Sequence, residues 1–95
     1  WIHWTLWNID PHTNEIKQGL LPSGAVEGIT SFGKTGYGGP CPPSGTHKYF
    51  FKIYALDIII SLQSSADIHA LMRAIQNHII DESYCIGVYS RTVDK

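Results

Sequence analysis

The segment that decides the fold spans residues 36–56 and reads GYGGPCPPSGTHKYFFKIYAL. Its second half, from Lys48 to Leu56, alternates along the chain and places Tyr49, Phe51 and Ile53 on one face. The opposite face carries two lysines, which indicates that it reaches solvent. Aromatic and β-branched side chains in alternation are typical of a β-strand. The segment therefore predicts a mainly β fold that includes this strand.

A glycine- and proline-rich loop precedes the strand. Residues 28–45 contain six of the nine glycines and three of the five prolines, a composition that excludes a helix or a central strand. Glycines permit positive φ and prolines stiffen the backbone, so N–H groups can converge on one point, as in an anion-binding nest. A plain tight connection between two elements is the alternative interpretation. A loop of this length in a compact domain is usually functional.

Residues Trp1 to Ile9 predict a second strand, in the same sheet as the strand from Lys48 to Leu56. Both faces of this stretch are largely apolar, which favours an interior strand with neighbours on both sides. The following Asp10-Pro11 ends it, because proline cannot donate to the ladder. Since Trp1 resembles the interior of a strand, we expect an upstream segment before it.

The remaining elements are a helix and two short strands. Residues Ser64 to Ile80 carry an apolar stripe at helical spacing, and Ser64 with Asp67 matches a loose capping box. Residues Tyr84 to Tyr89 alternate and predict a last strand. A short edge strand is expected within Ala25 to Ile29.

Composition limits the class of protein. The 95 residues suit one domain, and 43% hydrophobic residues are too many for a disordered chain. The net charge of -1 comes from scattered residues, whereas nucleic acid and anionic membranes need clustered positive charge. No apolar run approaches the ~18 residues of a spanning helix. We expect no nucleic-acid partner, no stable membrane insertion and a cytoplasmic location.

Histidines and aromatic residues are the strongest candidates for a binding site. His47 closes the glycine-rich loop, and Tyr49 follows on the same strand face, so imidazole and phenol point into one space. His3 lies between Trp1 and Thr5 in the first strand. Two histidines can donate hydrogen bonds to a phosphate-like group, although a histidine in an aromatic strand can also be a core residue.

Other chemistries have weaker support in the sequence. A metal site from His3, Asp10 and His12 would need ligands spread around a strand end without a recognised spacing. A nucleophile made from Cys41 and His47 lacks a feature that would lower the pKa of the thiol. Cys41 and Cys85 are interpreted as reduced thiols, with one disulfide as the alternative.

Two stretches carry a resemblance to a known family. They read WIHWTLWNI at residues 1–9 and FGKTGYGGPCPPSGTHKY at residues 32–49, and a helix and Gly-Val-Tyr at 87–89 follow them. Together they resemble the phosphatidylethanolamine-binding protein family, and most closely its prokaryotic Raf-kinase-inhibitor-like branch. The resemblance implies one domain over residues 1–95. This domain is expected to be an antiparallel Greek-key β-sandwich with a peripheral helix, and the sandwich is expected to lack its N-terminal strands.

The resemblance also implies a small pocket for phosphate-like, carboxylate-like or phospholipid-headgroup-like anions, without a cofactor. His3 and His47 are expected to line this pocket. The residues expected at its wall and rim are Tyr49, Pro43, Gly39 and Tyr37.

Two departures from the family pattern stand out. The family has His-Arg-Tyr where this chain has His47-Lys48-Tyr49, a change expected on the face away from the histidine. An acidic Asp-Pro-Asp-Ala-Pro segment, which the family carries upstream of the His3 strand and which supplies a pocket carboxylate, has no match in this chain. We therefore expect these residues alone to be unstable or associated, as a homodimer or with a separate N-terminal chain.

The resemblance implies a non-catalytic module that binds small anionic ligands and modulates protein kinases or proteases. Two alternatives stay open. One is an enzyme with a histidine-lined hydrolytic or metal-dependent site, and the other is an interaction fragment whose pocket is vestigial without the acidic segment.

Overall fold

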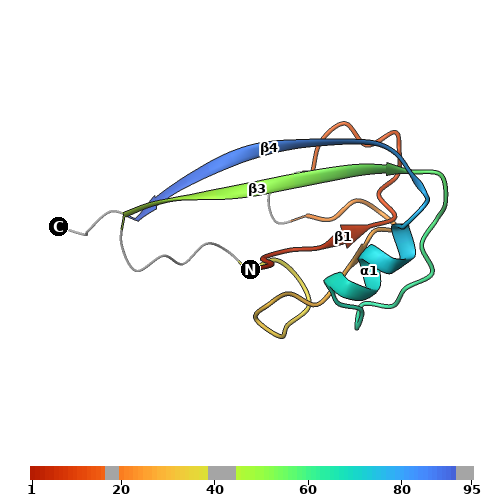
Figure 1. The fold of residues 1–95 in the computed structure, drawn as a ribbon, viewed down its shortest axis with the longest axis horizontal. Coiled ribbons are helices and arrows are strands. Elements are labelled where there is room, and N and C mark those ends of the chain that lie inside the picture. The colour runs from red at the N-terminus through yellow and green to blue at the C-terminus, as the bar shows by residue number, and fades with distance from the viewer. Residues whose placement is uncertain (17–19, 39–44, 92–95) are drawn as a thin grey trace.

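The computed structural model describes residues 1–16, 20–38 and 45–91, with the side chains of 45–47 and 88–91 outside that description. Two short strands are followed by a long strand, a helix and a second long strand (Figure 1). These elements are β1 (Leu6–Trp7), β2 (Val26–Glu27), β3 (Gly45–Leu56), α1 (Ile68–Ile75) and β4 (Ile79–Arg91). The strands pair antiparallel, β1 with β2 and β3 with β4, so the mainly β class with a peripheral helix is confirmed.

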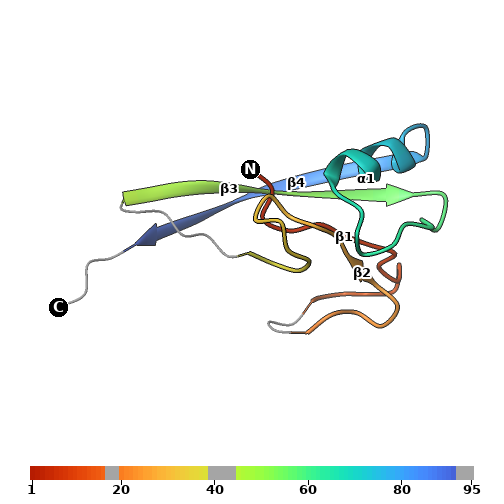
Figure 2. The same cartoon turned by 90° about the horizontal axis from the view of Figure 1, so that it is seen from below.

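β3 and β4 form a long antiparallel pair. Its register runs from Gly45 opposite Arg91 to Ala55 opposite Asp81, and a bulge then brings Leu56 opposite Ile79. The strand predicted from Lys48 is confirmed and begins earlier, at Gly45. In Figures 1 and 2 this pair spans the length of the molecule, while β1, β2 and α1 gather at the end where β3 stops and β4 starts.

The predicted C-terminal end of the helix is wrong, because Ile79 and Ile80 belong to β4. Asn77 has a φ of 69°, in the left-handed region, and interrupts the helical path after α1. The β-branched pair that follows favours extended backbone. As a result α1 is shorter than the predicted Ser64–Ile80, and β4 is longer than the predicted Tyr84–Tyr89.

The predicted N-terminal end of the helix is also displaced. Asp67 is the N-cap of α1, and its Oδ1 accepts a hydrogen bond from the backbone N–H of Ala70 at 3.0 Å. The same bond holds the pKa of Asp67 below its ordinary value of 3.8. Ser64, the expected cap, lies in the turn before the helix. In the described part of the chain no helix is long and apolar enough to cross a membrane.

β1 covers only two residues of the predicted strand Trp1–Ile9. Upstream of β1 the backbone bonds to loop segments, as where the N–H of Ser31 donates to the carbonyl of Ile2 at 2.9 Å. These loop partners do not continue as a strand, so no regular ladder forms. The short strand expected within Ala25–Ile29 is confirmed by β2. Within the described residues β1 shares no sheet with β3, so the expectation of one sheet is wrong.

A small core joins β1 to α1. Trp7, Ile60 and Ile75 are buried, and each large apolar side chain removed from water stabilises the fold by about 1.5–3 kcal/mol. The partly buried side chains packed around them are Val26, Tyr54, Leu56, Leu62, Ala66, Leu71 and Ala74. The core therefore holds the end of the β3–β4 pair, the helix and the short sheet together.

Asn8 ties the end of β1 to the segment after β3. Its Nδ2 donates to the carbonyl of Ile60 and its Oδ1 accepts from the N–H of Ile60, both at 2.8 Å. The φ of Asn8 is 58°, a left-handed conformation that asparagine tolerates better than most residues. One side chain thus satisfies both backbone groups of a core residue.

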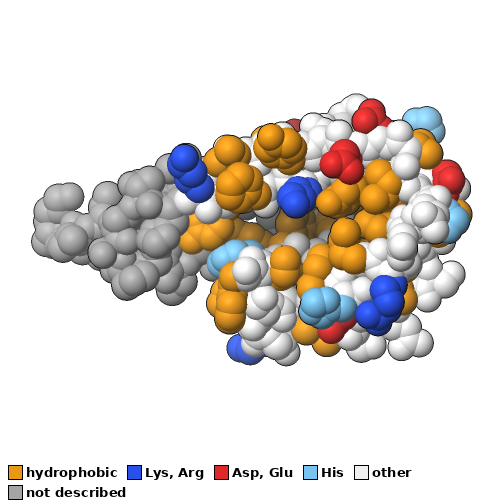
Figure 3. Space-filling view, viewed as in Figure 1, with side chains coloured by type: hydrophobic (Ala, Val, Ile, Leu, Met, Phe, Trp, Pro, Cys, Tyr) orange, Lys and Arg blue, Asp and Glu red, His pale blue; other side chains and the backbone are white. Residues whose placement is uncertain are grey.

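Much of the surface of the β3–β4 pair is apolar and exposed. Phe50 and Ile53 expose 62% and 65% of their surface on β3, and Tyr84 and Ile86 are exposed on β4. Figure 3 shows hydrophobic side chains gathered along the β3–β4 pair with lysines among them. Residues opposite each other in the two strands share a face, so Phe50 and Ile86 lie on one face. Ile53 lies on the other face, because it is an odd number of residues from Phe50. Apolar surface is therefore exposed on both faces.

Candidate functional site

His3 is held by two hydrogen bonds to one glycine. Its Nδ1 lies 2.7 Å from the carbonyl oxygen of Gly38, and its own carbonyl accepts from the N–H of Gly38 at 2.8 Å. The side chain is half-buried. These bonds join the start of the chain to the glycine-rich loop across 35 residues and fix the orientation of the imidazole.

Two aromatic rings flank this imidazole edge to face. The ring centroid of Phe32 lies 5.4 Å from that of His3, with an interplanar angle of 66°. The centroid of Tyr49 lies 5.1 Å away, with an angle of 82°. Edge-to-face pairs at these separations are favourable. His3 therefore lies where the first segment, the loop and β3 meet.

β3 contributes Tyr49 and, two residues earlier, His47. Alternation along the strand places them on one face, the face on which Tyr49 meets His3. Gly87 lies opposite Tyr49 in β4 and Tyr89 lies opposite His47. The side chain of His47 lies outside the described residues, so its place in the pocket beside His3 stays a prediction.

The other expected site residues divide into two groups. Gly39 and Pro43, like Cys41, lie outside the described residues. Tyr37 is exposed, and its ring packs against Trp4, with centroids 5.8 Å apart, rather than being paired with His3. Tyr37 at the rim of a pocket stays a prediction.

Trp4 and Glu27 make a second polar contact close to the first one in sequence. The indole Nε1 donates to Oε2 of Glu27 at 2.6 Å, and both side chains are half-buried. Because Glu27 belongs to β2, this bond fixes the first segment to the short sheet. It thereby supports the position of His3, the preceding residue.

Phe32 and Gly38 are site residues that the sequence analysis did not single out. A Cβ at Gly38 would lie 2.3 Å from ring carbons of Phe32, so a side chain at this position would force that ring to move. The signal that could have found them is the quoted run from residue 32, which already contains both. Composition explained only the number of glycines in the loop, not which glycine approaches a ring.

Residues Gly28 to Thr35 match the spacing Gly-x-x-x-x-Gly-Lys-Thr of a phosphate-binding P-loop. A P-loop must open a helix, and this segment forms a tight turn instead. Thr35 bridges back to Ile29, and the N–H of Thr30 donates to the carbonyl of Lys34 at 2.9 Å. The residues that follow, up to 38, are not helical. The match is therefore not a P-loop.

The metal site considered from His3, Asp10 and His12 does not form. Across residues 1–16, 20–38 and 45–91, no group of three or more His, Cys, Asp or Glu residues is placed to hold a metal ion. The N–H of His12 donates to Oδ1 of Asp10 at 2.8 Å, a local turn bond. Among the other histidines, His69 is exposed and His78 bonds to Asp57.

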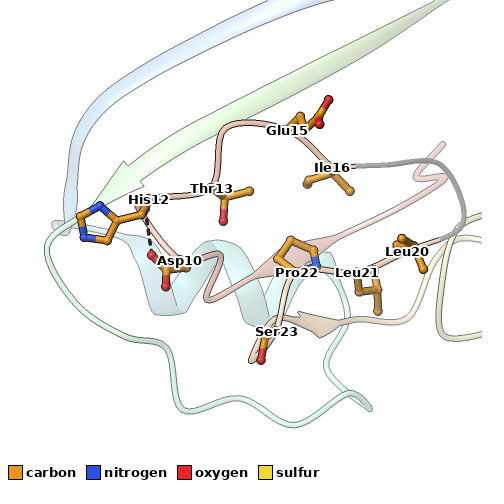
Figure 4. Close-up of a pocket in the computed structure, with 9 residues that line it drawn as sticks. All are labelled: Asp10, His12, Thr13, Glu15, Ile16, Leu20, Leu21, Pro22 and Ser23. Carbon is orange, nitrogen blue, oxygen red and sulfur yellow. Dashed lines mark hydrogen bonds between the residues drawn. The ribbon is translucent and has the colours of Figure 1, made fainter.

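A cavity of about 380 Å³ lies near that turn, away from His3. Figure 4 shows the ring of His12 turned away from the apolar side chains that line it. The lining residues are Asp10, His12, Thr13, Glu15, Ile16, Leu20, Leu21, Pro22 and Ser23. None of them is among the residues expected to bind the anion, so this hollow is distinct from the aromatic site around His3. Cys85 in β4 is exposed and free.

Similar proteins share this fold. The family model for phosphatidylethanolamine-binding protein matches residues 1–90. A UPF0098 protein of Methanothermobacter thermautotrophicus is 41% identical over 96 residues, which cover 96% of this chain and 64% of that protein. A UPF0098 protein of Chlamydia trachomatis is 35% identical over 91 residues, with 96% and 60% covered.

A solved homologue of phosphatidylethanolamine-binding protein from Chlamydia trachomatis superposes with a TM-score of 0.91 at 35% identity. The match covers 97% of this chain and 60% of the homologue. The chain thus spans about three fifths of the length of these relatives. Their names state no reaction and no ligand beyond that of the family name.

Proposed function

The chain belongs to the phosphatidylethanolamine-binding protein family, and on that premise we propose that it is a non-catalytic module binding small phosphate-like or phospholipid-headgroup-like anions at His3 and His47. The observation that carries the proposal is the seating of His3. Its imidazole is half-buried between Phe32 and Tyr49 and is bonded to Gly38. A ring held in place before the ligand arrives loses little freedom on binding, which favours affinity.

The surroundings of His3 suit binding of an anion. Apolar rings on two sides lower the local polarity, so a hydrogen bond to a charged ligand is stronger than in open water. Tyr49 carries a hydroxyl that can donate. The strand face beside it carries His47, and the preceding loop is rich in glycine, which lets its remaining backbone N–H groups converge on an anion.

The groups that surround His3 bind and orient rather than react. Phe32 and the backbone of Gly38 supply neither a nucleophile nor a proton acceptor of suitable strength. We therefore propose no turnover. Modulation of a protein kinase or protease would follow if the partner presents an anionic side chain, such as a phosphorylated residue, to the same site.

The test is a titration of the protein with inorganic phosphate and with phosphoethanolamine, followed by NMR of the histidine rings. Replacing His3 with Ala removes a hydrogen bond to a charged group, which is worth about 1.5–3 kcal/mol, or roughly tenfold or more in affinity. The matched control is His12→Ala, which removes an exposed imidazole from another loop.

Equal affinities of the unsubstituted protein and His3→Ala would place the anion elsewhere and contradict the proposal. Hydrolysis of a generic phosphate ester, lost in His3→Ala and kept in His12→Ala, would instead support the histidine-lined enzyme.

A further inference from the structure

The hydrogen bond between His3 and Gly38 determines which nitrogen of the neutral imidazole carries the proton. A backbone carbonyl has no hydrogen to give, so at 2.7 Å Nδ1 of His3 must be the donor. A neutral imidazole carries one N–H only. Neutral His3 is therefore the Nδ1–H tautomer, and its Nε2 is an acceptor.

This tautomer restricts what the proposed site can bind. Among the described residues the ring of His3 has one hydrogen bond, that from Nδ1. The nitrogen left for a ligand is Nε2, whose lone pair repels the lone pairs of a proton-free oxyanion. A contact forms only if a proton lies between them, either on the oxyanion or, taken from water, on Nε2.

From this geometry, and resting on the proposed function, we infer that the site selects oxyanions by their protonation. Ligands that keep an acidic O–H at neutral pH, as hydrogen phosphate does, donate that hydrogen to Nε2 of neutral His3. Oxyanions without a hydrogen, such as sulfate, bind only when His3 takes up one proton and becomes an imidazolium. Of the proposed ligands, the class favoured at neutral pH is then inorganic phosphate or a phosphate monoester that keeps one O–H, whereas the phosphodiester of a phospholipid headgroup has none and binds as sulfate does.

The described side chains in contact with His3 carry no charge near neutral pH. Phe32 and Gly38, from the loop, have no titratable side chain, and β3 presents the phenol of Tyr49. Lys48 lies on the opposite face of that strand. His47 shares the face of Tyr49, so the experiment must separate the two histidines.

The first measurement determines the tautomer without any ligand. Long-range proton–nitrogen correlation spectra of the ¹⁵N-labelled protein at mildly alkaline pH distinguish a protonated Nδ1 from a protonated Nε2. We expect Nδ1–H for His3. A protonated Nε2 would overturn the inference while leaving the proposed anion site untouched.

The second measurement compares sulfate with inorganic phosphate between about pH 5 and 8, where histidines titrate. Uptake of one proton predicts that sulfate affinity falls about tenfold per pH unit on the alkaline side. Phosphate affinity falls much less, because the ligand supplies the hydrogen. Calorimetry in two buffers of different ionisation enthalpy should show proton uptake with sulfate.

Three variants assign the effect. His3→Gln places an amide donor near the position of Nε2 at every pH, so the pH dependence of sulfate binding should flatten. His47→Gln, at the other proposed binding residue, should weaken both anions alike and keep the steep dependence. The exposed control His12→Gln should change neither the affinity nor its pH dependence.

Equal pH slopes for the two anions, or a slope that His47→Gln abolishes and His3→Gln keeps, would overturn the inference. Absence of binding by either anion at every pH would overturn the proposed function as well.

Discussion

The β3–β4 pair and the part of the chain before β3 differ in both backbone and side chains. The strands of the pair have 12 and 13 residues, whereas β1 and β2 have two each. Yet the regular β3–β4 pair exposes Phe50 and Ile53, while the irregular part of the chain before β3 buries Thr5 and Trp7. Regular hydrogen bonding and burial of apolar surface are therefore separate properties in this molecule, and His3 lies where the two regions touch.

The largest effect is expected in the irregular half, at Trp7. This residue is 3% exposed and packs against Ile60 and Ile75, so Trp7→Ala should lower the free energy of unfolding by about 3–5 kcal/mol. The matched control is Trp1→Ala, at a residue that is 77% exposed, with an expected change within about 0.5 kcal/mol. Urea denaturation measures both. Equal losses would mean that burial does not distinguish these tryptophans.

A smaller effect is expected at Asn8, which joins the two regions. Asn8→Ala leaves the N–H and the carbonyl of Ile60 without their partners and places alanine at a positive φ, at a cost of about 2–4 kcal/mol. Asn8→Gly keeps the backbone conformation accessible and loses only the hydrogen bonds, so it should cost less. If the two variants were equally stable, the backbone conformation of Asn8 would have no part in stability.

The smallest change in stability is expected on the β3–β4 pair, where the quantity to measure is self-association of the protein. Isolated, these 95 residues should self-associate in sedimentation, because exposed apolar strands without neighbours pair with other chains. Ile53→Lys should weaken that association and change the free energy of unfolding by no more than about 0.5 kcal/mol. Gln76→Lys adds the same charge after α1 and should leave association unchanged. A monomer over the whole concentration series would contradict this.

Local pattern accounts for the elements that the sequence predicted well. Aromatic and β-branched side chains from Lys48 to Leu56, with both lysines on one face, predict the strand β3 from local sequence alone. The helix ends were harder, since Ile79 and Ile80 continue the helical stripe and also suit a strand. Ile79 pairs with Leu56 of β3, which is distant in sequence, and this pairing selects the strand over the helix.

The candidate site shows the same division. Motif residues indicated His3, His47 and Tyr49, and the aromatic contact between His3 and Tyr49 agrees with that grouping. The quoted motif run contains Phe32 but does not indicate that its ring flanks His3. That contact joins residues 29 positions apart and depends on how the loop folds back over the first segment.

The sequence by itself determined that the protein is mainly β, that a glycine-rich loop precedes the long strand, and which family the chain belongs to. It did so because propensity, alternation and motif spacing are properties of neighbouring residues. Tertiary contacts alone show that Nδ1 of His3 donates to the carbonyl of Gly38 and that Nε2 is therefore an acceptor. A tautomer depends on which atom lies within hydrogen-bond distance, and that atom comes from a residue 35 positions away.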